Sequence, residues 1–160
     1  MMYKNVCLSA LLCILIALLS FAEKQPVKKP DFTGEYVFFA EKSKLQSPVP
    51  KSATLSIKHQ EPAFTLTRTL VFTGKPETWN VQLTTDGKEV VKEEKTRKLI
   101  SKCYWDGHDL IVESKVIQKD TQETTITRYS LSDHGKTLTA TEQFRGAVLK
   151  YFNQWIFSKR

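Results

Sequence analysis

The sequence predicts an all-β fold, an antiparallel up-and-down β-barrel of eight to ten strands, and three observations support this prediction. Thr, Val, Ile, Leu and aromatic residues alternate with polar residues at period two through most of residues 31–160. Connections of two to four residues, such as those containing Asp86-Gly87 and Asp106-Gly107, separate these stretches and are typical of antiparallel hairpins. The region has no convincing helical periodicity. Successive hairpins favour a closed meander over a two-sheet sandwich, which is the alternative.

The first residues form a separate segment. Lys4 precedes an apolar run, and Ser20-Phe21-Ala22 places small residues at both key positions of a cleavage site. This pattern predicts a secretory signal peptide at residues 1–22, cut after Ala22, and a secreted or periplasmic protein without a stable membrane span. An uncleaved anchor is the alternative, but the apolar run is shorter than the roughly 20 residues that a span requires.

A flexible leader and one barrel domain are predicted to follow. Residues 23–30 are polar and contain two prolines, whereas residues 31–160 carry the strand pattern. Cys103 is the one cysteine left after cleavage, so the domain has no internal disulfide and depends on packing. The net charge of +7 is spread along the chain, and the large aromatic residues fall on the inward face. This distribution indicates a solvated surface rather than a nucleic-acid site.

The strands are expected in the following order. The first covers residues 32–39, and residues 42–51, with Pro48 and Pro50, form the longest loop. The segment at residues 88–98 is heavily charged, and its mixed signs are typical of a solvated sheet edge; a recognition edge is the alternative. The other strands are expected at residues 52–60, 63–73, 77–84, 88–94, 97–105, 109–118, 123–132, 136–144 and 148–158.

The alternation also predicts which side chains point into the barrel. Two interpretations remain open: the inward aromatic residues line an apolar ligand cavity, or they fill a small barrel completely. In the first case the candidate ligand-binding residues are Tyr36, Phe38, Leu55, Ile57, Phe64, Leu66, Arg68, Trp79, Val81, Cys103, Tyr129, Glu142 and Trp155.

Arg68 is the charged residue that the pattern places inside. It shares a strand face with Leu66 and Leu70, so its guanidinium is expected to point inward. A buried guanidinium needs a partner, and Glu142, in phase with Leu138, is the expected one. Arg68 then either receives a ligand carboxylate or another anion, or forms an internal salt bridge.

Several motifs resemble the calycins, the superfamily of lipocalins and fatty-acid-binding proteins. Phe32-x-Gly34-x-Tyr36 resembles the Gly-x-Trp opening of that superfamily, with Tyr36 where Trp is usual. Residues 84–88, 105–114 and 131–138 are similar to segments of small secreted bacterial lipocalin-like proteins. The resemblance covers about the whole mature domain and implies an antiparallel barrel with an apolar cavity.

Two departures limit what the resemblance to fatty-acid-binding proteins implies. Those proteins carry two helices after their first strand, and residues 42–51 are too short and too proline-rich to form them. They also hold a carboxylate with an Arg-x-Tyr pair, whereas Arg128 and Tyr129 are adjacent here and point to opposite faces. The usual carboxylate anchor is therefore not expected.

The sequence offers no recognisable catalytic or metal-binding constellation. Cys103 lies in the middle of a strand, where a buried and unreactive thiol is expected, and His59, His108 and His134 lack metal-ligand spacing. No cofactor is predicted. We expect an exported, non-catalytic binding protein for a small apolar or amphipathic ligand held inside the barrel. The alternative is an envelope or extracellular module with a solid core that acts through protein partners.

Overall fold

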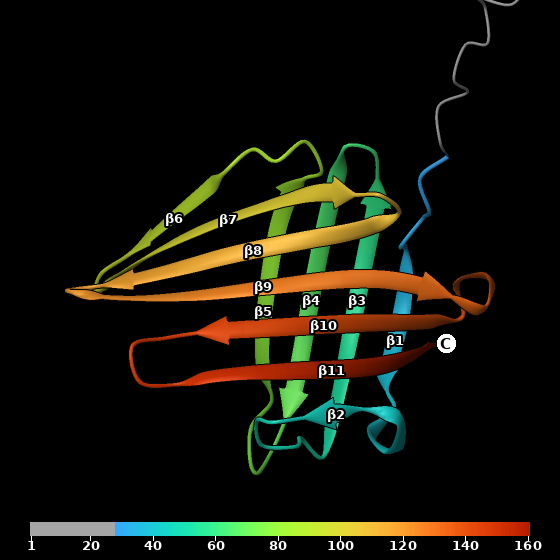
Figure 1. The fold of residues 1–160 in the computed structure, drawn as a ribbon, viewed down its shortest axis with the longest axis horizontal. Coiled ribbons are helices and arrows are strands. Elements are labelled where there is room, and N and C mark those ends of the chain that lie inside the picture. Colours follow the sequence, from blue (N-terminus) through green and yellow to red (C-terminus); the bar gives the residue numbers. More distant parts are fainter. Residues whose placement is uncertain (1–27) are drawn as a thin grey trace, which may run out of the picture.

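The computed structural model describes residues 28–160, so the predicted signal peptide lies outside the described residues. Eleven antiparallel strands form one sheet that curls into a nearly closed barrel (Figure 1). Neither of the short 3₁₀ turns of the described chain, Ala40–Lys42 and Asp133–Gly135, is long enough to span a membrane. The strands are β1 Gly34–Phe38, β2 Lys44–Leu45, β3 Ser52–Gln60, β4 Ala63–Val71, β5 Glu77–Thr84, β6 Val90–Glu94, β7 Arg97–Asp106, β8 Asp109–Gln118, β9 Thr121–Ser132, β10 Thr137–Arg145 and β11 Lys150–Lys159.

Ten of these strands correspond to the ten expected from the alternation, and β2 is the addition. It lies within the predicted loop at residues 42–51 and pairs with β11. Side chains hold it there: Ser43 Oγ accepts the N–H of Ile156 at 2.9 Å, and Asn153 Oδ1 accepts the N–H of Gln46 at 2.8 Å. The partners Gln46 and Asn153 are 107 positions apart in sequence, so no local pattern predicts this strand.

β1 joins the two halves of the barrel. The strand order is β5-β4-β3-β1-β11-β10-β9-β8-β7-β6, which places the first strand between β3 and the last strand. Figure 1 shows β3–β5 crossing behind β7–β11, so the sheet folds into two walls that face each other. This continuous meander confirms the predicted up-and-down barrel.

The barrel is incomplete between β5 and β6, the two ends of the strand order, and we call this boundary the β5–β6 seam. The connection between these strands attaches to β7 instead. The N–H of Gly87 donates to the carbonyl of Cys103 at 2.8 Å, and Asp86 forms an isolated bridge with Tyr104. The seam is therefore fixed at the end where β5 finishes.

The inward faces of the strands pack into a core around Phe32, which precedes β1. Tyr36 donates its hydroxyl to the carbonyl of Phe32 at 2.8 Å, and burial raises the pKa of Tyr36 to about 12. Burying a large side chain of this kind contributes about 1.5–3 kcal/mol of transfer free energy. The large apolar side chains that are essentially inaccessible to solvent are Phe32, Tyr36, Leu55, Ile57, Phe64, Leu66, Leu110, Leu138 and Phe157.

A polar cluster closes the barrel beside Phe32. The Glu61 carboxylate, in the β3–β4 turn, accepts hydrogen bonds from Trp105 Nε1 at 2.8 Å and Thr85 Oγ1 at 2.6 Å. His59 Nε2 lies 2.9 Å from the same carboxylate, and His59 Nδ1 accepts the N–H of Phe32, so Nε2 carries the proton. We call these residues the closed-end cluster. It ties the β3–β4 turn to β7, to the β5–β6 connection and to the start of the domain.

The closed-end cluster predicts an acid-dependent contribution to stability. Burial alone would raise the pKa of Glu61, but the hydrogen bonds from Thr85, His59 and Trp105 outweigh it and hold the pKa below the ordinary 4.5. A carboxyl with a lower pKa in the folded state stabilises that state above the unfolded pKa and loses this contribution as the pH falls through the folded pKa. Glu61→Gln should therefore lower the free energy of unfolding at neutral pH and reduce its decline below pH 4.5.

Urea unfolding followed by tryptophan fluorescence across this pH range measures both effects. Glu93→Gln is the control, because that exposed carboxylate on β6 makes one ion pair, with Lys98 at 3.6 Å. Parallel pH dependences for wild type and Glu61→Gln would show that the cluster does not hold an ionised carboxylate.

Candidate functional site

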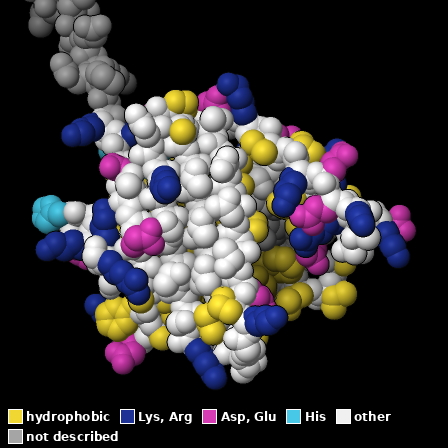
Figure 2. Space-filling view, turned by 180° about the vertical axis from the view of Figure 1, so that it is seen from behind, with side chains coloured by type: hydrophobic (Ala, Val, Ile, Leu, Met, Phe, Trp, Pro, Cys, Tyr) yellow, Lys and Arg dark blue, Asp and Glu magenta, His cyan; other side chains and the backbone are white. Residues whose placement is uncertain are grey.

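A cavity of about 550 Å³ occupies the other end of the barrel, beyond the packed core. Its walls come from the end of β4, the beginning of β5 and the facing parts of β7–β11, while the loop before β3 borders its mouth. Figure 2 shows the hollow on one side of the molecule, with hydrophobic side chains inside it. The lining residues are Ser47, Pro48, Arg68, Leu70, Phe72, Glu77, Thr78, Trp79, Leu99, Val112, Ser114, Val116, Thr125, Thr127, Tyr129, Glu142, Phe144, Tyr151 and Trp155.

The cavity decides between the two interpretations of the inward aromatic residues. The barrel is packed solid at the closed end and open at the other, so neither interpretation describes the whole interior. The volume of the open part falls within the range of about 300–1,000 Å³ that is typical of small-molecule sites. The wholly solid core that the alternative function assumed is therefore not found.

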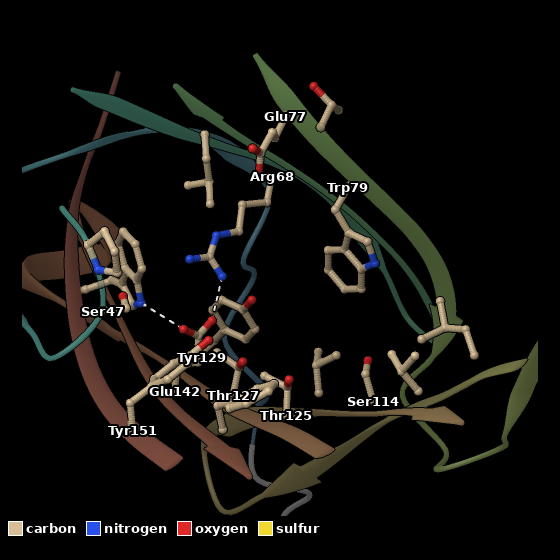
Figure 3. A pocket seen from close by; sticks show the side chains of 18 of the residues that line it. Ser47, Arg68, Glu77, Trp79, Ser114, Thr125, Thr127, Tyr129, Glu142 and Tyr151 are labelled. Atoms are coloured by element: carbon tan, nitrogen blue, oxygen red, sulfur yellow. Dashed lines mark hydrogen bonds and ion pairs between the residues drawn. The ribbon is translucent and has the colours of Figure 1, made fainter. Parts of the chain in front are cut away.

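An ion pair lies at the inner end of the cavity. Arg68 Nη1 on β4 donates to Glu142 Oε2 on β10 at 2.6 Å, which confirms the predicted partner (Figure 3). The Glu142 side chain is 6% exposed and that of Arg68 is 18% exposed, and the guanidinium stacks on Trp155 with 4.4 Å between Cζ and the ring centre. The pair thus connects the two walls across the interior, where removing either charge leaves the other unpaired.

The second oxygen of Glu142 is also occupied. Glu142 Oε1 accepts hydrogen bonds from Asn153 Nδ2 at 3.1 Å and from Trp155 Nε1 at 3.4 Å. Asn153 is completely buried, and its Oδ1 accepts the N–H groups of Gln46 and Ser47. A chain of hydrogen bonds therefore runs from Arg68 through Glu142 and Asn153 to the loop at the cavity mouth.

Two tyrosines supply neutral hydroxyl groups to the cavity. Burial raises the pKa of Tyr129, which is enclosed deep in the barrel, and that of Tyr151 nearer the mouth. Tyr151 also stacks on Phe144, with ring centres 4.8 Å apart and planes 9° apart. Both phenols stay protonated at neutral pH, so they can donate and accept hydrogen bonds without adding charge.

The structure divides the thirteen predicted ligand-binding residues between the cavity and the core. Cavity-lining residues among them are Arg68, Trp79, Tyr129, Glu142 and Trp155. The others pack in or against the core away from this cavity: Tyr36, Phe38, Leu55, Ile57, Phe64, Leu66, Val81 and Cys103. All thirteen lie inside the barrel, because the period-two alternation fixes the face of each strand. Alternation does not show where along the barrel axis a residue lies. That position decides whether the residue belongs to the core or to the cavity.

Most of the cavity residues that were not singled out continue the same strand faces. Leu70 and Phe72 follow Arg68 at period two, and Tyr151 precedes Trp155 in the same phase. Extending each inward face to the end of its strand would have found them. Ser47 and Pro48 carry no such signal, because a long-range contact between their loop and Asn153 places them at the mouth.

The remaining chemical candidates do not assemble into a second site. Cys103 is buried without exposed surface, and burial raises the pKa of its thiol to about 12. Arg128 points out of the barrel and pairs with Asp106 and Asp109, while its neighbour Tyr129 points in, as predicted. Within residues 28–160, no group of three or more His, Cys, Asp or Glu side chains is arranged to hold a metal ion.

The sequence matches no protein-family model and no curated protein, whereas the fold has clear structural counterparts. A secretory abundant heat soluble protein from Ramazzottius varieornatus superposes with a TM-score of 0.58 at 12% identity, over 80% of this chain and 94% of that one. Human cRBP IV, a cellular retinol-binding protein, has a TM-score of 0.52 at 15% identity, over 82% and 99%. A zebrafish ileal bile acid-binding protein complexed with cholic acid has a TM-score of 0.51 at 17% identity, over 81% and 98%.

These likenesses show the fold alone: the chain folds as a calycin-like barrel, which is the fold that the motifs around Gly34 implied. The similarity to small secreted bacterial lipocalin-like proteins stays a prediction.

The buried ion pair leads to a stability prediction. Arg68→Met should lower the free energy of unfolding by about 2–4 kcal/mol, because it leaves the Glu142 carboxylate buried without its counter-charge. Adding Glu142→Gln should recover at least about 1 kcal/mol of this loss, since the amide is neutral and still accepts from Asn153. Urea denaturation of the three proteins measures both values.

Arg128→Met is the matched control, since its ion pairs lie on the outer surface and should be worth less than about 1 kcal/mol. Equal losses for Arg68→Met and Arg128→Met, or no recovery in the double variant, would contradict a buried and mutually dependent pair.

Proposed function

We propose that this protein is an exported, non-catalytic binding protein that holds a small apolar or amphipathic ligand in the barrel cavity. The observation that carries the proposal is the cavity of about 550 Å³, whose walls combine aromatic and aliphatic side chains with a polar group at the inner end. Each 100 Å² of apolar ligand surface that such a cavity removes from water contributes about 2.5 kcal/mol. The bile acid-binding and retinol-binding proteins of the same fold add support by analogy.

A binding role suits the chemical state of the cavity better than catalysis. Its two buried charged groups, Arg68 and Glu142, bind each other and are stabilised by neighbouring side chains. The one thiol of the described chain is buried elsewhere and protonated at neutral pH. The arrangement therefore supports retention of a molecule rather than its conversion.

Native mass spectrometry of the protein isolated from its own host is the most direct test. A co-purified small molecule, released on unfolding, is the expected result. Purified protein that carries no such molecule and binds none from a lipid extract of the same host would argue against the proposal.

Filling the cavity should abolish binding without unfolding the barrel. Val116 on β8 lines the cavity, and Val116→Trp places an indole in the space of the ligand. We expect at least about tenfold weaker binding of the neutral fluorescent probe Nile red, equivalent to about 1.4 kcal/mol. Val91→Trp on β6 is the matched control, because Val91 is 48% exposed on the outer surface and its variant should bind normally. Equal affinities for the two variants would place the probe outside the cavity.

Export is the second part of the proposal, and it rests on the sequence of residues 1–22. When the full chain is produced in its host, the mature protein should begin at Glu23 and appear in the medium or the periplasm. N-terminal sequencing and intact mass measure the cleavage point. A cell-associated protein that still begins at Met1 would contradict export by cleavage.

A further inference from the structure

We infer that the ligand carries an uncharged polar head, such as a hydroxyl or carbonyl group, and that the cavity discriminates against carboxylates. The inference rests on the proposed binding function and specifies the ligand class of that site. Its starting point is the charge inventory of the cavity. The lining contains one positive side chain, Arg68, and two negative ones, Glu142 and Glu77. The formal charge of the lining is therefore −1, and no positive charge is left over to attract an anion.

The arginine that would receive a carboxylate is already neutralised. Glu142 Oε2 lies 2.6 Å from Arg68 Nη1, and its other oxygen is held by Asn153 and Trp155. A carboxylate arriving beside Arg68 would meet the negative charge of Glu142 at short range in a poorly solvated site, where repulsion is stronger than in water. Displacing Glu142 would instead leave a nearly inaccessible carboxylate without a counter-ion, which is the more costly outcome.

The same groups suit a neutral head. Among the described residues, Glu142 is the only hydrogen-bond partner of Arg68, so guanidinium N–H groups remain that can donate to an alcohol or carbonyl oxygen. Tyr151 and Thr125 add hydroxyl-bearing side chains to the lining, and Figure 3 shows Tyr129 and Thr127 close to the ion pair. An ammonium head gains little beside the ion pair, because Arg68 repels it and both oxygens of Glu142 already accept hydrogen bonds.

Three ligands with the same twelve-carbon chain test the inference on the wild-type protein. Dodecanol, dodecanoate and dodecylammonium, each below its micelle concentration at pH 8, compete with Nile red for the cavity. We expect dodecanol to bind at least about tenfold more tightly than either ion, equivalent to about 1.4 kcal/mol. Dodecanoate or dodecylammonium binding as tightly as dodecanol would overturn the inference while leaving the proposed binding function intact. If none of the three displaces the probe, both proposals fail.

The variant Glu142→Gln tests the cause of the discrimination. The amide keeps one of the two oxygens, which can accept from Arg68 or from Asn153, and it removes the negative charge. The ratio of dodecanoate to dodecanol affinity should therefore rise about tenfold. Glu93→Gln makes the same change of charge on the outer strand β6, where the Glu93 side chain is 74% exposed. This variant should leave the affinity ratio as in wild type. An unchanged ratio in Glu142→Gln, or an equal change in both variants, would show that the pair does not set the preference. Circular dichroism confirms that each variant is folded before comparison.

Discussion

The ion pair between Arg68 and Glu142 connects the two walls of the barrel, and the arrangement of the cavity depends on it. Neither charge has a favourable place in this interior alone, because the cost of burying an unpaired ion exceeds what packing around it returns. The walls must therefore meet at a fixed distance and register at this point. Asn153 extends the requirement to the loop before β3, so the depth of the cavity and the position of its rim are set by one connected group of side chains.

The interior of the barrel is filled differently at its two ends. At the closed end, Trp105 donates a hydrogen bond to Glu61, and its ring packs against that of Phe32, with ring centres 6.0 Å apart. At the cavity end, the ion pair between Arg68 and Glu142 lies beside an open space of about 550 Å³.

Much of the fold could be predicted from the sequence because the patterns that determine it involve residues that are close together in the chain. Alternation and hairpin turns depend on neighbouring residues, so the ten main strands and the inward direction of Arg68 and Glu142 follow from the pattern. The boundary between core and cavity cannot be predicted from that local pattern. It depends on which strands face each other across the interior once β1 has joined the two halves of the sheet. Trp105 illustrates the difference: its strand and turn were predicted, but its hydrogen bond to Glu61 joins residues 44 positions apart and places it in the closed-end cluster.

The β5–β6 seam gives this barrel a mechanical asymmetry. A backbone hydrogen bond in a ladder contributes about 0.5–1.5 kcal/mol, and separating any other neighbouring pair of long strands breaks several such bonds at once. Across the seam that resistance is missing, apart from the attachment of Gly87 to Cys103 at one end. The wall therefore resists deformation least at the seam. This resistance decreases with distance from the attachment, toward Glu77 and the mouth of the cavity. The β5–β6 seam can therefore widen around a molecule in the cavity, while the hydrogen-bonded strand pairs in the rest of the barrel stay intact.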